Sequence, residues 1–200
     1  MRDASRQNVI VPGTAVIERA NVVPAGLAGQ WYVAHTKARN EKALTEDLTR
    51  MGIPCYLPLV QRETRSRRTR RISRSTVPVF SGYVFFNATP EQRYQSLTTN
   101  RIARVLVVPD QERFVAELER IARLIATQKG FLVVHKIGVG DWGRIVSGPL
   151  QGLEGVIVRC AARWRLSMNV TILGQSVQVD VDRQDVEKID PPAWALNART

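Results

Sequence analysis

Cysteines, histidines, aromatic residues and long apolar runs are all scarce in this 200-residue sequence. Its two cysteines, Cys55 and Cys160, lie far apart, and it has only two histidines. This spacing excludes a disulfide framework and a cluster of closely spaced metal ligands. We therefore expect a chain that works in a reducing compartment and binds no metal and no cofactor.

Membrane segments and catalytic motifs are missing as well. No apolar run approaches the roughly 18–20 residues of a membrane-spanning helix. Residues 1–27 contain Asp3, Glu18 and Arg19 and no continuous apolar core, so they do not form a secretory signal. A G-x-G-x-x-G match at 138–143 is followed by a strand pattern rather than a helix, unlike a dinucleotide site. We expect a cytoplasmic protein that is not an enzyme and has no membrane partner.

Acidic residues are the minority, and the positive charge is concentrated in one segment. The chain carries 29 Lys and Arg against 18 Asp and Glu, a net charge of +11. Residues 61–76 hold seven arginines and one glutamate, which is +6 of that total. Arginine makes planar, bidentate contacts with phosphate, and even a disordered basic segment binds anionic polymers. The segment therefore predicts nucleic acid, or a machine that carries it, as the partner.

Residues 30–128 show strand and helix patterns in turn. Strand formers fill 31–37, 53–60, 77–86 and 103–108. The middle two segments flank the Arg-rich stretch as a long hairpin, and we expect its basic part to be disordered in the free protein. Helices are predicted to begin after Asn40, Thr89 and Asp110, each a good N-cap residue. This order is typical of an antiparallel sheet with helices on one face.

After residue 128 the pattern changes to short strands separated by turn signals. The predicted strands are 142–146, 155–159, 166–173 and 176–181, with a hairpin turn at Gly174-Gln175. We therefore divide the chain into a flexible tail (1–28), an α+β domain (29–128) with the Arg-rich hairpin at 61–76, a linker (129–137), a small all-β barrel (138–190) and a C-terminal tail (191–200). The linker contains an apolar run at 131–134, which we expect to pack on one of the domains.

Three motifs occur in order along the chain. The first is Trp31-Tyr32-Val33, and the second is F-S-G-Y-V-F at 80–85, directly after the basic hairpin. The third, at 139–158, is similar to a KOW motif, whose core is a strand, a Gly-rich turn and a second strand. Its turn residues are Gly140, Asp141, Gly148, Gly152 and Gly155. KOW segments also occur in ribosomal proteins, but the three motifs together resemble the NusG family of transcription elongation factors over about residues 30–189.

The resemblance implies a fold, an activity and partners. It implies an N-terminal NGN domain, an α/β sandwich that binds RNA polymerase at the clamp helices of its largest subunit. It also implies a C-terminal KOW domain, an SH3-like barrel that recruits a ribosomal protein or a termination factor. Some specialised relatives refold the KOW segment into a helical hairpin, but the alternation of β-branched residues here predicts the barrel. The implied activity is processive elongation and antitermination, achieved by binding rather than catalysis.

The resemblance also implies which residues contact the polymerase. Carried over by position, they are Trp31, His35, Phe80, Tyr83 and Phe85. Strict alternation would put Phe80 and Tyr83 on opposite faces of a strand, and a bulge at Ser81-Gly82 would bring them to one face. The alternative for each aromatic residue is ordinary core packing.

Nucleic-acid contacts are expected in two places. Specialised members of the family read the non-template DNA strand, and the candidate residues here are Lys37, Arg39, Asn40, Asn100 and Arg101. The hairpin would reach upstream DNA or nascent RNA through Arg65, Arg67, Arg68, Arg70 and Arg71. The strongly basic hairpin favours a specialised, RfaH-like paralogue that acts on a subset of operons. The alternative function is a ribosome-associated KOW protein that binds ribosomal RNA.

Overall fold

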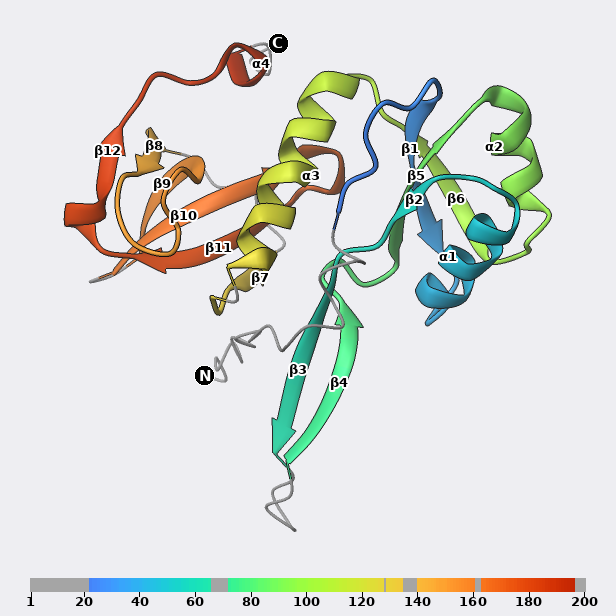
Figure 1. The fold of residues 1–200 in the computed structure, drawn as a ribbon, viewed down its shortest axis with the longest axis horizontal. Coiled ribbons are helices and arrows are strands. Elements are labelled where there is room, and N and C mark those ends of the chain that lie inside the picture. Colours follow the sequence, from blue (N-terminus) through green and yellow to red (C-terminus); the bar gives the residue numbers. More distant parts are fainter. Residues whose placement is uncertain (1–21, 66–71, 128, 135–139, 161–162, 197–200) are drawn as a thin grey trace, which may run out of the picture.

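The computed structural model describes residues 22–65, 72–127, 129–134, 140–160 and 163–196. The predicted contacts at Arg67, Arg68, Arg70 and Arg71, and most of the predicted N-terminal tail, lie outside these residues. Figure 1 shows two sheets with the long helix α3 (Gln111–Ala126) between them. None of the described helices has the length and hydrophobicity that a membrane crossing requires.

The first sheet forms an α/β sandwich, which we call the sandwich domain (30–126). Its antiparallel strand order is β2 (Cys55–Tyr56), β5 (Tyr83–Ala88), β1 (Gln30–Thr36) and β6 (Ile102–Val107). Alternation along β5 sends Phe86 into one apolar cluster, with helix α1 (Glu41–Arg50), and Phe85 into another, with α3. Helices therefore cover both faces of the sheet, and the prediction that they share one face was wrong.

A predicted N-cap side chain caps its helix unless it is hydrogen-bonded to another part of the chain. Helix α2 (Pro90–Leu97) begins at the predicted N-cap Thr89 with a capping box, because Gln92 N–H donates to Thr89 Oγ1 at 3.3 Å and Thr89 N–H donates to Gln92 Oε1 at 3.0 Å. Asp110 likewise caps α3. Asn40 precedes α1 but does not cap it, since its Oδ1 accepts from Arg101 instead.

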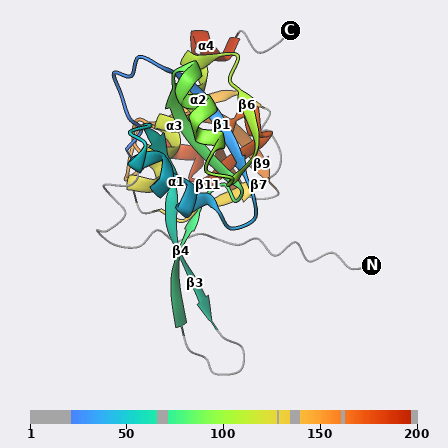
Figure 2. The ribbon, with the colours of Figure 1, turned by 90° about the vertical axis from the view of Figure 1, so that its right-hand side faces the viewer.

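The Arg-rich segment forms a separate two-stranded ribbon. Strands β3 (Leu59–Arg65) and β4 (Ile72–Pro78) pair from Leu59 and Pro78 to Arg65 and Ile72. The ribbon projects from the body of the molecule (Figures 1 and 2). The long hairpin is confirmed, and the expected disorder is wrong for residues 61–65 and 72–76, which are paired strands.

The second sheet, which we call the β domain (131–188), has six antiparallel strands. Their order is β12 (Val186–Lys188), β8 (Trp142–Ile145), β9 (Glu154–Cys160), β10 (Arg163–Val170), β11 (Gln175–Val181) and β7 (Leu132–Val134). Short 3₁₀ turns follow β10 (η2, Thr171–Leu173) and β11 (η3, Arg183–Asp185). The segment therefore takes the β form rather than a helical hairpin. The predicted linker is in part β7, which pairs with β11.

The two predicted tails also contribute to the packing. Val23 and Leu27, from the range expected to be flexible, pack against the main core. Near the other end, the short helix α4 (Ala193–Leu196) carries Trp194 against Trp142, with ring centroids 5.3 Å apart. Short tail segments fold back because their apolar side chains find uncovered surface on the domains.

Candidate functional site

A pair of rings at the surface lies at the end of the central strands of the sandwich domain. His35 on β1 is directly opposite Tyr83 on β5, and their ring centroids are 5.2 Å apart. On its other side His35 pairs with Arg104 of β6. His35 and Arg104 are exposed, and Tyr83 is half-buried. We call these three residues the β-edge row, and it can offer aromatic and cationic contacts to a partner.

A tight turn positions Tyr83 in this row. Tyr83 N–H donates to Phe80 O at 3.2 Å, and Gly82 has a φ of 84°, a left-handed conformation that favours glycine. Two hydrogen bonds hold the Gly82 backbone in place. Its N–H donates to Glu41 Oε1 at 2.7 Å, and its carbonyl accepts from Thr36 N–H at 2.8 Å. The predicted bulge at Ser81-Gly82 is therefore a turn, and it separates Phe80 from Tyr83 instead of placing them on one surface.

The other predicted polymerase contacts lie in the core. Phe80 is 1% exposed, Phe85 is 0% and Trp31 is 5%. Phe85 and Trp31 both pack edge-on against Phe114 of α3, with centroids 5.5 and 6.3 Å away. In this arrangement the three side chains have no surface for a partner, because α3 uses the same sheet face for its apolar stripe. These three residues therefore match the alternative that the sequence left open, which is ordinary core packing.

The predicted DNA-contacting residues come together from two loops. Lys37 Nζ donates to Asn100 Oδ1 at 2.6 Å, and Arg101 Nη1 donates to Asn40 Oδ1 at 2.9 Å. The backbones also meet, since Lys37 N–H donates to Arg101 O at 2.8 Å. Arg39 and Asn100 both have positive φ, at 60° and 55°. A non-glycine residue at positive φ is uncommon, and such strain gathers at functional sites.

Asp47, which the sequence did not single out, anchors this loop pair. Its carboxylate accepts hydrogen bonds from Arg101 Nε and from Arg50. The Arg101 hydrogen bond is the main reason that the pKa of Asp47 lies below its ordinary value of 3.8. Arg101 is therefore partly neutralised and braced, whereas Arg39 is exposed at the tip of its loop. Spacing alone could not reveal this, because the partners lie 54 residues apart.

Sequence comparison assigns the sandwich domain and its flanks to a known family. The family model described as "Transcription termination factor nusG" matches residues 29–130, just over half of the chain. The chain belongs to the NusG family. Members of this family are transcription factors rather than enzymes, and the α/β domain followed by a β-rich domain agrees with the architecture that the sequence motifs implied.

Individual relatives are distant. The transcription termination/antitermination protein NusG of Borreliella burgdorferi (strain ATCC 35210 / DSM 4680 / CIP 102532 / B31) is 24% identical over 184 residues, covering 80% of this chain and 98% of that protein. A chain in the crystal structure of the MjSpt4:Spt5 complex (conformation B) is 14% identical and covers 80% of this chain and 97% of its own length, with a TM-score of 0.27.

The predicted KOW turn connects β8 to β9. Gly148 and Gly152 have φ of 77° and 80°, so both need the left-handed region. Gly155 and Gly140 serve close approach instead, because a Cβ at either position would lie within 2.6 Å of a carbonyl oxygen on a neighbouring strand. Asp141 contributes an exposed carboxylate, 3.2 Å from Lys188 Nζ. These residues shape the β domain.

The NusG-like sandwich domain and the β domain meet through a polar contact at the end of β10. Glu117 of α3 is 2% exposed, and its carboxylate accepts from Thr171 N–H at 2.8 Å, Thr171 Oγ1 at 2.5 Å and Arg113 Nε at 3.1 Å. Arg113 also donates to Thr171 Oγ1 at 2.6 Å. Apolar residues of both domains belong to one continuous cluster around this contact.

A buried cation, Arg120 of α3, lies at the same contact between the two domains. The Arg120 guanidinium lies 4.3 Å from the Trp194 ring centroid and 5.3 Å from that of Trp142. Burial lowers the pKa of Arg120 to about 10. The guanidinium still stays charged at neutral pH, and two indole faces replace part of its hydration. The sequence offered one signal for this, since three of its four tryptophans occur after residue 140.

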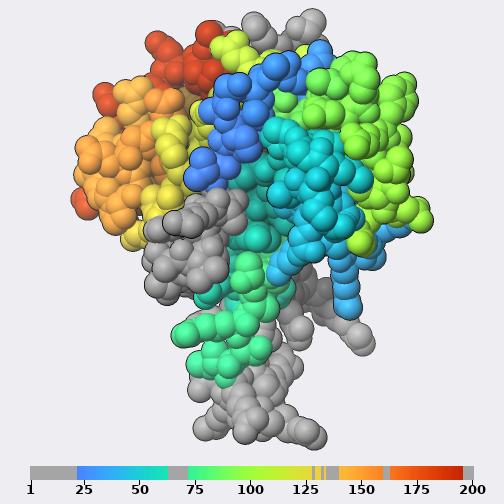
Figure 3. Space-filling view, turned by 45° about the vertical axis from the view of Figure 1, so that its right-hand side comes forward, coloured from blue at the N-terminus to red at the C-terminus, as the bar shows by residue number. Residues whose placement is uncertain are grey.

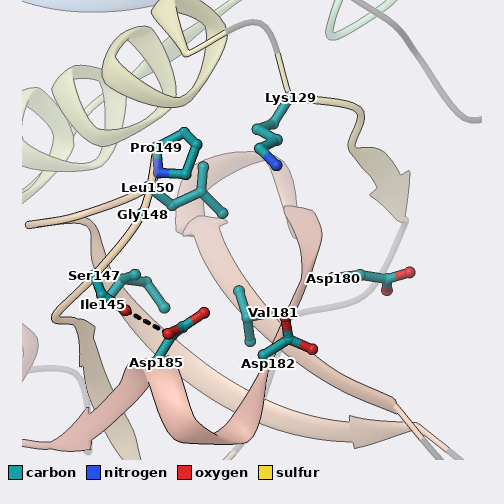
Figure 4. A pocket seen from close by; sticks show the side chains of 10 residues that line it. All are labelled: Lys129, Ile145, Ser147, Gly148, Pro149, Leu150, Asp180, Val181, Asp182 and Asp185. Atoms are coloured by element: carbon teal, nitrogen blue, oxygen red, sulfur yellow. Dashed lines mark hydrogen bonds between the residues drawn. The ribbon is translucent and has the colours of Figure 1, made fainter.

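Figure 4 shows a small hollow of about 80 Å³ in the β domain, near the KOW turn. Two of its three carboxylates are already engaged: Asp180 pairs with Arg163 and Arg165, and Asp185 accepts from the Ser147 hydroxyl. No group of three or more potential metal ligands lies together in the part of the chain that the structure describes. We assign no ligand to this hollow.

Proposed function

We propose that this NusG-family protein binds RNA polymerase through the β-edge row and promotes processive elongation and antitermination. The observation that carries the proposal is the ring pair of exposed His35 and half-buried Tyr83, at the end of the central strands of the domain that matches the family model. The predicted target on the polymerase is the pair of clamp helices of the largest subunit. A factor that prefers the closed, elongating state shifts the polymerase toward it by that difference in affinity.

Polymerase capture tests this assignment. A His35→Ala, Tyr83→Ala double variant is expected to lose co-purification with RNA polymerase from lysate while its circular dichroism spectrum stays unchanged. Tyr94→Ala is the matched control, because Tyr94 is an exposed aromatic residue, 66% exposed, on α2 of the same domain. Phe80 is unsuited to this test, since truncating a buried Phe costs about 3–5 kcal/mol of folding stability. Wild-type capture by the double variant would refute the contact.

The same capture discriminates the rival function. A ribosome-associated protein would bring down ribosomal subunits in place of polymerase, and ribosomal RNA would compete for it. The ribosomal alternative explains the charge and the KOW motif, but not the match of residues 29–130 to the NusG model.

The loop pair of Lys37, Arg39, Asn40 and Arg101 belongs to the proposal as the contact for the non-template strand. Positive charge beside amide groups suits a single-stranded backbone and its exposed bases. Arg39→Gln is expected to weaken binding to an elongation complex with an exposed non-template strand. Arg123→Gln, an exposed arginine on α3, is the control that should leave binding unchanged.

Specialisation to a subset of operons is the finer part of the proposal, and the basic ribbon supports it. Occupancy mapping along the genome should show this protein on a few long transcription units. Occupancy of most transcribed genes would instead indicate a general factor. In either case, we expect the β domain to recruit a ribosomal protein or a termination factor.

A further inference from the structure

A groove of about 290 Å³ lies on the β domain, on strands that Figure 1 places on the side away from the sandwich sheet. Two indoles, Trp142 of β8 and Trp164 of β10, form its walls. Its charged lining consists of three cations and one carboxylate: Arg159, Arg183, Lys188 and Asp141. Two of the four tryptophans in the chain thus lie half-exposed in one hollow.

The groove is preformed by close packing. Ile157 and Val186 also line it, and both pass directly over Gly143, where a Cβ would come within 2.9 Å of each side chain. Arg183 lies 5.7 Å from the Trp164 ring centroid, within the range of a cation–π contact. A ligand therefore meets aromatic surface and positive charge that are already in place.

The groove lies beside the domain contact, because the ring of its Trp142 also packs against Trp194 and lies 5.3 Å from the Arg120 guanidinium of α3. Trp164 stands near the start of β10, whereas Thr171, which binds Glu117, follows its end. Seven residues of extended chain separate the two by roughly 23 Å. Trp164, which is half-exposed, is therefore well separated from that polar contact.

We propose that this groove binds single-stranded RNA. The lining carries a net charge of +2, from three cations and Asp141, which selects an anionic partner. The half-exposed Trp164 ring, flanked by Arg183, can stack a nucleobase regardless of sequence, while the cations contact the phosphates. Asp141 is 71% exposed beside Lys188 and offers an acceptor to a ribose 2′-hydroxyl, the group that distinguishes RNA from DNA.

This site does not depend on the proposed function. It needs no polymerase, and purified protein is sufficient to test it. Loss of polymerase binding would leave the groove unaffected, and an empty groove would leave the polymerase contact standing. To separate it from the basic ribbon, the measurements use the full chain with Gln in place of Arg67, Arg68, Arg70 and Arg71.

Site-resolved NMR provides the direct test. With ten-nucleotide oligouridine RNA as the probe, the indole N–H signals of Trp142 and Trp164 are expected to shift. The signal of Trp31 serves as internal control, because that ring is 5% exposed in the sandwich core. Unmoved signals of Trp142 and Trp164 under saturating RNA would overturn the proposal.

Matched variants quantify the contacts by fluorescence anisotropy. Trp164→Leu is expected to weaken oligouridine binding about ten-fold, the loss of one stacked base. Arg183→Gln should weaken it several-fold. Arg163→Gln is the matched control, since Arg163 is 72% exposed, pairs with Asp180 and points to the opposite face of β10 from Trp164. Equal effects of the two arginine changes would refute a groove-specific contact.

Two further ligands test the identity of the occupant. Oligodeoxyuridine differs from the RNA probe only in the 2′-hydroxyls and should bind several-fold more weakly, with the difference reduced in Asp141→Asn. Equal binding of both would overturn the assignment to RNA. A ten-residue peptide of Glu and Phe should not compete with the RNA. If it displaced the RNA from the groove, the site would be assigned to acidic peptides instead.

Discussion

At the scale of single residues, Glu117 determines how the two domains meet. Its carboxylate lies on the buried side of α3, is 2% exposed and accepts three hydrogen bonds, two of them from Thr171 of the β domain. A buried carboxylate is tolerated only when its acceptor sites are used in this way. Glu117 therefore specifies one docking position for η2, which general apolar contact would leave open.

Replacing Glu117 by Ala is expected to lower the free energy of unfolding by about 2–4 kcal/mol, because Arg113 and the Thr171 N–H lose their buried acceptor. Urea denaturation measures the loss. Glu119→Ala, an exposed change two positions further along α3, should stay within about 0.5 kcal/mol of wild type. Similar values for both variants would show that the domain contact adds no stability.

Asp47 gives a pH-dependent prediction at the same scale. Its pKa is lowered, chiefly by the Arg101 hydrogen bond, so the folded state binds its proton less readily than the unfolded chain. The brace therefore stabilises the fold above the unfolded pKa of about 3.9 and is lost as pH falls through the lower folded value. In an NMR titration, Arg101→Gln should raise the pKa of Asp47 more than Arg50→Gln does. A larger rise in the Arg50 variant would contradict the assigned brace.

At the scale of elements, the β3–β4 ribbon is the feature that reaches furthest from the body. In the space-filling view the described part of the ribbon stands clear of the domains (Figure 3). A twisted two-stranded ribbon with no sheet on either side is marginal by itself. Here its base is secured, since Val60 is buried and Val79 N–H donates to Pro58 O at 2.8 Å. The ribbon thus extends away from the two domains.

Replacing Arg67, Arg68, Arg70 and Arg71 by Ala is expected to weaken binding to duplex DNA and to flatten its salt dependence. If all four contact phosphates, the slope of log K against log salt falls by about 3.6. Titrations at several salt concentrations measure it. Arg50→Ala, Arg123→Ala removes two exposed charges outside the ribbon and should leave the slope nearly unchanged. An unaltered slope in the ribbon variant would exclude it as the DNA contact.

At the scale of the whole molecule, one apolar cluster runs through both domains. It joins Trp31 and Phe85 of the sandwich domain to Leu118 on α3 and to Met168 and Val177 of the β domain. Helix α3 supplies apolar side chains in both directions, which explains why it is buried so widely. The chain is therefore one folding unit in this arrangement rather than two domains on a free tether.

Unfolding in urea should accordingly be a single cooperative transition. The indole NMR signals of Trp31 and Trp164 report the two domains separately, and their midpoints are expected to coincide. Ile121→Ala, a cavity in the shared cluster, should shift both midpoints together, since Ile121 is fully buried. Two separated midpoints would show that the domains unfold independently.

Prediction from sequence succeeded where the controlling interactions are local. The helix starts at Thr89 and Asp110 and the alternating strands of the β domain all follow from neighbours a few residues apart. The same is true of the hairpin around the Arg-rich segment, whose arms pair by simple proximity. Motif order then led to the NusG family, which the family model confirmed.

Prediction failed where a position depends on distant parts of the chain. The burial of Phe80 and Phe85, the helices on both sheet faces and the pairing of β7 with β11 all result from packing between segments dozens of residues apart. For the candidate site, sequence reasoning named His35, Tyr83 and the loop pair, whose contacts stay predictions. It missed Asp47, because the partner Arg101 lies in another loop.

The sequence by itself therefore determined the elements, the charged ribbon and the family, since backbone propensity, periodicity and composition are written in neighbouring residues. Only the tertiary structure decided which aromatic side chains are core and which are surface. That choice depends on what covers each sheet face: α3 buries Phe85, while His35 stays exposed and Tyr83 half-buried at the end of their strands. The same folding leaves Trp142 and Trp164 beside three cations in an open groove, an arrangement that no spacing in the chain reveals.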